Sequence, residues 1–265
     1  MIFGSRPSFF HLAFFLLGAL MLLFIVAPLV RITLDSSASE LSEALGDREL
    51  WASIFLTLRA AGVATIISIL FGVPLAYLLA HARFPGRSLV LGVIDLPIMI
   101  PHSAAGLALL TVIGRHSLAQ KIAGPLGIEF VGEEAGIATA MAFVSVPFLV
   151  NAAREGFTAV PVRLENVART LGARPSRVFF TISLPLAWRA VFSGMVLMWA
   201  RGISEFGAVI IIAYHPMTTP ILVFQRFSDF GLTYARAAAV VLILVCVIGF
   251  ALLRFLSRPK RGEVR

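Results

Sequence analysis

Long apolar runs dominate the chain and are separated by shorter polar segments. A hydrocarbon core about 30 Å thick takes roughly 20 apolar residues per helix, and six runs are close to this length or above it. They span residues 9–30, 54–80, 88–113, 136–153, 190–213 and 237–253. The pattern therefore predicts an all-α integral membrane protein, with six transmembrane helices in one domain over residues 1–265.

The composition supports a protein that lies in a membrane rather than in water. Hydrophobic residues make up 59% of the chain and charged residues only 14%, with a mean hydropathy of +0.94. A soluble domain carries about 25% charged residues, so this chain has too few polar side chains to cover a water-soluble globule. A soluble enzyme, a nucleic-acid-binding domain and a disordered protein are therefore excluded.

The motifs that mark common catalytic and cofactor sites do not occur in the sequence. The single cysteine, Cys246, excludes a disulfide framework and a cysteine-based metal site. The phosphate-binding pattern GxxxxGK[ST] is missing, and so is the HExxH pattern of metalloproteases. We therefore expect no catalytic residue, no metal and no cofactor in this chain.

The charges of the loops predict how the helices are oriented. The first run is too long for the apolar core of a signal peptide, so we expect it to remain as a helix. Both termini then share one side with loops 81–87 and 154–189, and these segments together carry 14 Lys and Arg against three acids. The alternate loops 31–59, 114–135 and 214–236 carry seven Lys and Arg against nine acids. The positive-inside rule places both termini and the 154–189 loop in the cytoplasm.

The 154–189 loop has the pattern of two short helices joined by a turn. Gly172 is suited to end the first helix and Pro175 to begin the second. Leu184-Pro185 is then expected to break the second helix and return the chain to the membrane. The apolar residues of the first helix follow helical spacing, at Leu164, Val167, Ala168 and Leu171. This pattern by itself fits either a helix resting on lipid headgroups or an element that docks another protein.

The same loop resembles a motif of the permease subunits of binding-protein-dependent ABC importers. That motif reads Glu-Ala-Ala, three residues, Gly, nine residues, Ile-x-Leu-Pro. Asn166-Val167-Ala168 occupies the Glu-Ala-Ala positions, so the Glu and the first Ala are replaced, and Glu165 stands immediately before them. The resemblance implies a loop that couples the helices to an ATPase, carried by Glu165, Ala168, Gly172, Ile182, Leu184 and Pro185.

Three further segments are similar to the oxyanion branch of these permeases. Trp199–Ala208 resembles the Ala-Arg-x-x-x-Glu-Phe-Gly-Ala segment of molybdate, tungstate and sulfate permeases, and Asp95–His102 fits the same branch. Ala213–Met217 looks most similar to the molybdate/tungstate members. The resemblance implies the ABC importer type I permease fold, as a homodimer in the plasma membrane of a prokaryote. It also implies two copies of a cytoplasmic ATPase, which binds ATP and Mg²⁺, and an extracytoplasmic oxyanion-binding protein.

Three charged residues lie inside the predicted spans. An Arg or Asp at the centre of a membrane helix costs about 2.5–3.5 kcal/mol, so Asp95, Arg201 and Glu205 should each face protein or water. Arg201 and Glu205 are four residues apart and share one helical face. Two interpretations stay open. One is an internal ion pair, extended to Asp95, that holds helices together, and the other is an anion route in which Arg201 compensates the charge of the substrate.

The third run is interrupted by Pro97 and Pro101. Each proline lacks an N–H and leaves a carbonyl further back unpaired, so we expect a kink. A kinked helix beside the dimer axis fits a gate and fits a static packing bend equally well, while His102 is expected to be a polar packing residue. The candidates for the translocation pathway or gate are Asp95, Pro97, Pro101, Arg201 and Glu205.

The sequence therefore predicts the membrane-spanning subunit of an ATP-driven importer of molybdate or tungstate. The nearest alternative is the same machine for sulfate or thiosulfate. An alternative of another class is a membrane enzyme or a secondary transporter that uses Asp95 and Glu205 as a proton relay. Selection of the oxyanion belongs largely to the binding protein, so the permease sequence does not separate the anions.

Overall fold

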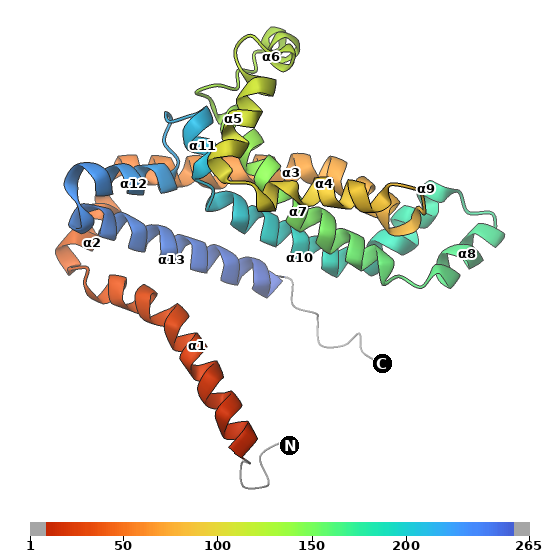
Figure 1. The fold of residues 1–265 in the computed structure, drawn as a ribbon, viewed down its shortest axis with the longest axis horizontal. Coiled ribbons are helices and arrows are strands. Elements are labelled where there is room, and N and C mark those ends of the chain that lie inside the picture. The colour runs from red at the N-terminus through yellow and green to blue at the C-terminus, as the bar shows by residue number, and fades with distance from the viewer. Residues whose placement is uncertain (1–8, 257–265) are drawn as a thin grey trace.

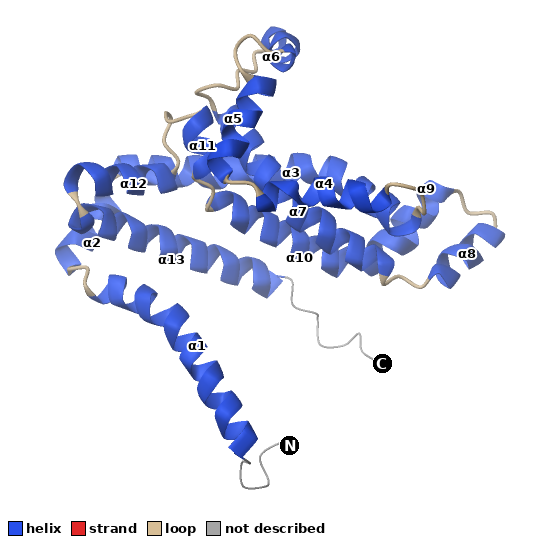
Figure 2. Cartoon of the chain, in the orientation of Figure 1, coloured by secondary structure: helices blue, strands red, loops and turns tan. Residues whose placement is uncertain are grey.

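The computed structural model describes residues 9–256, and every regular element in that range is a helix (Figure 2). The longer helices are α1 (Phe9–Leu34), α3 (Arg48–His81), α4 (Arg87–Met99), α5 (His102–Ile113), α7 (Glu134–Thr158), α10 (Leu184–Ile203), α12 (Thr219–Phe230) and α13 (Leu232–Leu256). The shorter ones are α2 (Ala38–Gly46), α6 (Leu118–Ala123), α8 (Val162–Thr170), α9 (Pro175–Val178) and α11 (Gly207–Ile212), with a 3₁₀ turn at Gly124–Leu126 and a π-helical turn at Phe179–Ser183. Residues 1–8 and 257–265, which carry part of the basic charge behind the predicted orientation, lie outside the described range.

Among the described residues, five helical stretches are long and apolar enough to span a membrane, and there are six candidate spans if α4 and α5 are counted as one broken span. Five are single helices, namely α1, α3, α7, α13 and the stretch that ends with α10, and the sixth is α4 and α5 together. The bounds differ from the predicted ones most clearly in the fifth span, which is expected over 190–213 and is found as Pro175–Ile203. α3 also differs, since it begins at Arg48 rather than at 54. The reason is a cap: the side chain of Asp47 accepts hydrogen bonds from the backbone N–H groups of Glu49 and Leu50.

Small residues allow α3, α7 and α10 to lie closely side by side (Figure 1). Ala60, Ala61 and Ala64 of α3 are buried in one cluster with Ala140 and Met141 of α7. Membrane helices associate largely through such close backbone approach, because lipid offers no hydrophobic driving force between them. The three helices form the centre of the subunit, and α10 joins the 154–189 loop at one end to Glu205 at the other.

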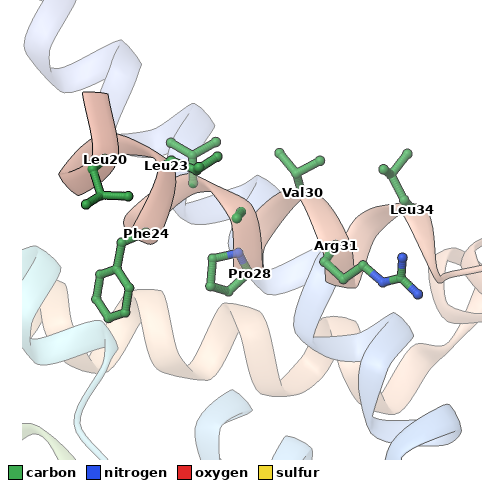
Figure 3. Close-up of a pocket in the computed structure, with 9 residues that line it drawn as sticks. Leu20, Leu23, Phe24, Pro28, Val30, Arg31 and Leu34 are labelled. Carbon is green, nitrogen blue, oxygen red and sulfur yellow. The ribbon is translucent and has the colours of Figure 1, made fainter. Parts of the chain in front are cut away.

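α1 stands apart from this centre. It diverges from the other helices toward the N-terminus (Figure 1), and none of its residues is buried. A pocket on its side is lined by residues of α1 alone, among them Phe24, Pro28 and Leu34 (Figure 3). An apolar surface of this extent has to be covered by lipid or by another chain.

The third span is broken at Ile100 and Pro101. A proline disfavours the helical conformation in the residue before it, and Ile100 has extended backbone angles, with φ −78° and ψ 147°. The expected kink is therefore a complete break, at which α5 leaves α4 with a bend of 114°. Pro97, in contrast, lies inside α4 and is buried.

Pro185 does not break its helix, contrary to the prediction. α9, the π-helical turn and α10 form one continuous helical stretch over Pro175–Ile203. In the turn, the N–H of Leu184 donates to the carbonyl of Phe179, five residues back instead of four. This shift in hydrogen-bond register comes just before the proline, which has no N–H to donate, and the helix continues through it.

Candidate functional site

A buried carboxylate organises the end of α10. Glu205 lies in the connection between α10 and α11, and its side chain is 0% exposed. Three donors surround it, namely Nη2 of Arg201 at 2.9 Å, Nδ1 of His102 at 2.7 Å and the backbone N–H of Ala208 at 2.9 Å. A carboxylate taken out of water needs such compensation. The ion pair expected between Arg201 and Glu205 is present, and it belongs to a larger cluster.

His102, at the start of α5, is the third member of this cluster. Nη2 of Arg201 lies 2.8 and 3.0 Å from its two ring nitrogens. A neutral imidazole that donates from Nδ1 to Glu205 keeps Nε2 free to accept from Arg201. The sequence predicts a polar packing residue at this position, and in the structure the contacts of His102 link α5 to the end of α10. Its partner Glu205 is 103 residues away in the chain, beyond the reach of any local pattern.

Close contact between α5 and α11 is what brings His102 to Glu205. A Cβ atom at Gly207 would lie 2.8 Å from the Cβ of His102, closer than side chains come in real proteins. A Cβ atom at Gly106 would lie 2.9 Å from the carbonyl oxygen of Ala208. Glycine at these two positions therefore permits the helix contact on which the cluster depends.

Asp95 forms a separate polar contact. Its Oδ1 accepts a hydrogen bond of 2.6 Å from the side-chain amide of Asn151, so α4 is tied to α7. Among the described contacts, none joins Asp95 to Arg201 or Glu205. The Arg201–Glu205 ion pair therefore does not extend to Asp95. Of the two candidate gate prolines, Pro97 is buried and Pro101 is exposed at the break. The candidate pathway residues thus lie at two polar sites and a helix break, not in one continuous group.

The 154–189 loop contains the predicted turn between helices. α8 is followed by Gly172 with φ +84°, in the left-handed region that favours glycine. The N–H of Ala173 donates to the carbonyl of Ala168, and the N–H of Gly172 donates to that of Arg169, both at 3.0 Å. This pair of bonds is a Schellman motif, which satisfies the carbonyls at a helix end. Pro175 then begins α9, as its position predicts.

The two faces of α8 differ sharply. Leu164, Val167 and Leu171 point outward, with Leu171 83% exposed, and they leave an apolar face open to another surface. Glu165 points inward and is only 1% exposed. Of the other motif residues, Gly172 and Pro185 are exposed, and Ala168, Ile182 and Leu184 are half-buried. The loop therefore exposes an apolar face, and Glu165 is not part of it.

The sequence model of the binding-protein-dependent transport system inner membrane component matches residues 68–262, a range that includes both the loop and the Glu205 cluster. The chain belongs to this family. It is 40% identical to the molybdate/tungstate transport system permease protein WtpB of Thermococcus kodakarensis, over 93% of this chain and 95% of that protein. It is 41% identical to WtpB of Methanocaldococcus jannaschii, over 95% of this chain and 98% of that protein. The molybdenum transport system permease protein ModB of Escherichia coli is 39% identical over 60% of this chain and 70% of its own length.

Solved structures with a similar fold come from ABC transporters. A bacterial transporter that imports alginate matches with a TM-score of 0.70 at 16% identity, over 96% of both chains. The MetNI methionine transporter matches with a TM-score of 0.62 at 17% identity, over 78% of this chain and 92% of that one. At these identities the likeness establishes the fold, and it agrees with the type I importer permease fold expected from the sequence.

Proposed function

We propose that this chain is the membrane-spanning subunit of an ATP-driven importer of molybdate or tungstate. The observation that carries the proposal is the loop of α8, Gly172 and α9, which presents an apolar face at one end of a helical core of this family. The names of the archaeal relatives support molybdate or tungstate as the anion, since four of them are molybdate/tungstate transport system permease proteins at 40–41% identity.

The loop is proposed to lie in the cytoplasm, where an ATP-binding subunit docks on the outward face of α8. The excess of Lys and Arg in 154–189 and in its companion segments supports this side. Two such ATPases, each holding its own ATP and Mg²⁺, would serve one permease dimer, and an oxyanion-binding protein would deliver the dianion from outside. This chain then contributes no catalytic residue and no cofactor of its own.

The unburied surface of α1 supports the homodimer. A helix with no buried residue gains little from packing on its own subunit, and a second copy together with lipid offers the cover that it lacks. In such an assembly the Arg201–His102–Glu205 cluster, the α4–α5 break and the Asp95–Asn151 contact are the features of this chain that can respond to helix movement.

Reconstitution tests the proposal. Proteoliposomes containing the permease, its ATPase and the binding protein should take up labelled molybdate or tungstate only with ATP inside and binding protein outside. Competition with sulfate and thiosulfate separates the oxyanions, because the preferred anion displaces the others at the lowest concentration. Uptake driven by a proton gradient without ATP would contradict the proposal and favour a secondary transporter.

A further inference from the structure

α8 has one buried side chain through which it reaches the centre of the subunit. Glu165 is its only buried residue, and the helix otherwise lies against α9 and the π-helical turn. Figure 1 shows α8 at the far end of the subunit, beyond α9. A partner protein can therefore push or pull on α8. The parts of the subunit that move with it depend on the contacts of Glu165.

The carboxylate of Glu165 joins three segments. The hydroxyl of Ser183, the last residue of the π-helical turn before α10, donates to it at 2.6 Å. Nε2 of His81, the last residue of α3, lies 3.1 Å away. Nη2 of Arg169, one helical turn further along α8, is at 3.6 Å. Glu165 therefore reaches α3 and the stretch leading into α10, and among the described contacts it does not reach α4 or α5.

A cluster of aromatic rings makes this attachment point rigid. The ring of Tyr77 packs edge-on against Phe157 of α7 and Phe179 of the π-helical turn, with centroids 5.3 and 4.9 Å away. It also lies 4.4 Å from the ring of His81. Edge-to-face pairs have a preferred geometry, and Phe157 is fully buried. The groups that hold Glu165 are thus fixed to the packed centre of the subunit.

We propose that Glu165 is the joint through which movement of α8 is passed to α3 and α10. It is a positioning residue, distinct from the face of α8 that meets the ATPase, and this role rests on the proposed function. The physical reason is that one oxygen of this buried carboxylate, Oε1, contacts both the Ser183 hydroxyl and the His81 ring. Sliding of α8 would break both contacts and leave buried polar groups unpaired, which is costly. An apolar contact in its place would allow α8 to move alone.

The matched variants Glu165→Gln and Glu155→Gln test the joint. Both remove one negative charge near the same loop, but Glu155 is exposed on α7 and Glu165 is buried. Each permease is reconstituted with the ATPase and molybdate-loaded binding protein, and uptake and ATP hydrolysis are measured together. For Glu165→Gln we expect the ATPase to remain bound and molybdate uptake per ATP hydrolysed to fall on the order of tenfold. Glu155→Gln should keep the wild-type ratio.

Two results would overturn the role of Glu165. A merely structural role lowers the number of active complexes, so uptake and hydrolysis fall together and their ratio stays unchanged. Loss of ATPase co-purification would place Glu165 in the docking surface instead. If Glu165→Gln does not reach the membrane, Ser183→Ala and His81→Gln remove one partner each and should lower the same ratio. If the wild-type complex shows no ATP-dependent uptake, the proposed function itself is contradicted. If the wild-type complex takes up molybdate and Glu165→Gln has the same uptake per ATP hydrolysed, only the role of Glu165 is contradicted.

Discussion

Two glutamates are buried in the described part of the chain, and each is held by the same kinds of group. Glu165 and Glu205 both have an arginine four residues away and a histidine from another helix. The distances differ, since the arginine lies at 3.6 Å from Glu165 and at 2.9 Å from Glu205. The arginine is therefore a close partner of Glu205, beside His102 and the N–H of Ala208, whereas Glu165 is held mainly by the neutral donor Ser183 and by His81.

Removing Arg201 should leave Glu205 buried with too few donors. Breaking a buried ion pair from one side costs about 3–5 kcal/mol, so Arg201→Ala should lower the melting temperature in detergent on the order of 10 °C. Adding Glu205→Ala should restore part of the loss, because no buried charge is then unpaired. Thermal unfolding of the single and double variants measures this. A stable Arg201→Ala protein that transports poorly would favour the anion route, and one that transports fully would contradict both interpretations.

Gly172 should tolerate side chains poorly because of its backbone conformation. A φ of +84° is strongly disfavoured for a β-branched residue, although no atom lies within 4 Å of a Cβ built there. Gly172→Val should therefore insert and dimerise, yet bind the ATPase weakly and lose stimulated hydrolysis, since its side chain also separates the docked surfaces. Gly172→Ala should be milder. Co-purification of the ATPase and stimulated hydrolysis test both variants, and wild-type coupling in Gly172→Val would mark the loop as a passive helix on the membrane surface.

At this scale, only contacts within one helical turn follow from the sequence. The four-residue spacing of Arg201 and Glu205 predicts their pairing, and the glycine after an amphipathic run predicts the turn at Gly172. His102 and His81 lie 103 and 84 residues from the glutamates they contact. Such contacts arise from the packing of whole helices, and no spacing rule reveals them.

The break between α4 and α5 is the largest departure of an element from its predicted form. It is set by Pro101, which fixes the extended conformation of Ile100, and not by Pro97, which α4 accommodates. The fixed angle holds His102 at the start of α5, where it reaches Glu205. The break and the cluster are thus parts of one arrangement.

Replacing Pro101 should loosen this bend. In Pro101→Ala, Ile100 is free to adopt helical angles, so the relative orientation of α4 and α5 should become heterogeneous. Spin labels at the exposed positions Leu89 and Val112 should give a narrow distance distribution in the wild-type protein and a broad one in this variant. Pro97→Ala is the control and should leave the distribution narrow. Equal distributions in all three proteins would mean that the contacts of α5, not the proline, set the bend.

Another group of charged residues lies where α2, α3 and α12 meet. Asp47 caps α3 and forms an ion pair with Arg226 of α12. Partial burial acts to raise the pKa of Asp47, but the hydrogen bonds from Arg226, Leu50 and Glu49 outweigh it and hold the pKa below its ordinary value of 3.8. A pKa lowered by folding means that the ionised form stabilises the folded state.

The stability contributed by Asp47 should be lost in acid. It is present above the unfolded pKa and disappears as the pH falls below about 4, through the lowered folded value. Melting temperatures of the solubilised protein should therefore decline in that range. Asp47→Asn should be less stable at neutral pH and show a shallower decline, whereas Glu43→Gln, at an exposed position of α2, should behave as the wild type. Parallel curves for Asp47→Asn and wild type would contradict this.

Hydropathy predicts the existence of the helices more accurately than it predicts their ends. The six spans follow from apolar length, but α3 extends to Arg48 because Asp47 caps it, and the helix through Pro185 continues because a π-helical turn precedes it. Caps and turns depend on single hydrogen bonds, which carry little weight in an average over twenty residues.

For the molecule as a whole, the distribution of Lys and Arg among the loops predicts the orientation of the chain in the membrane. The 154–189 loop and Ser42 of α2 should lie on opposite sides of the membrane. In a protein with Cys246→Ser, an impermeant thiol reagent applied to intact cells should label Ser42→Cys and should label Arg174→Cys only after permeabilisation. Labelling of Arg174→Cys in intact cells would reverse the orientation.

The separation of α1 from the other helices also predicts how the subunit unfolds when it is pulled mechanically out of the bilayer. A helix with no buried residue is retained by the surrounding lipid, because little packing ties it to its neighbours, and local unfolding is easiest where such contacts are fewest. Pulled from its N-terminal end, α1 would leave the bilayer as a separate mechanical unit while α3, α7 and α10 stay folded. The extra force needed in the assembled transporter would then measure how tightly a neighbouring subunit grips this helix.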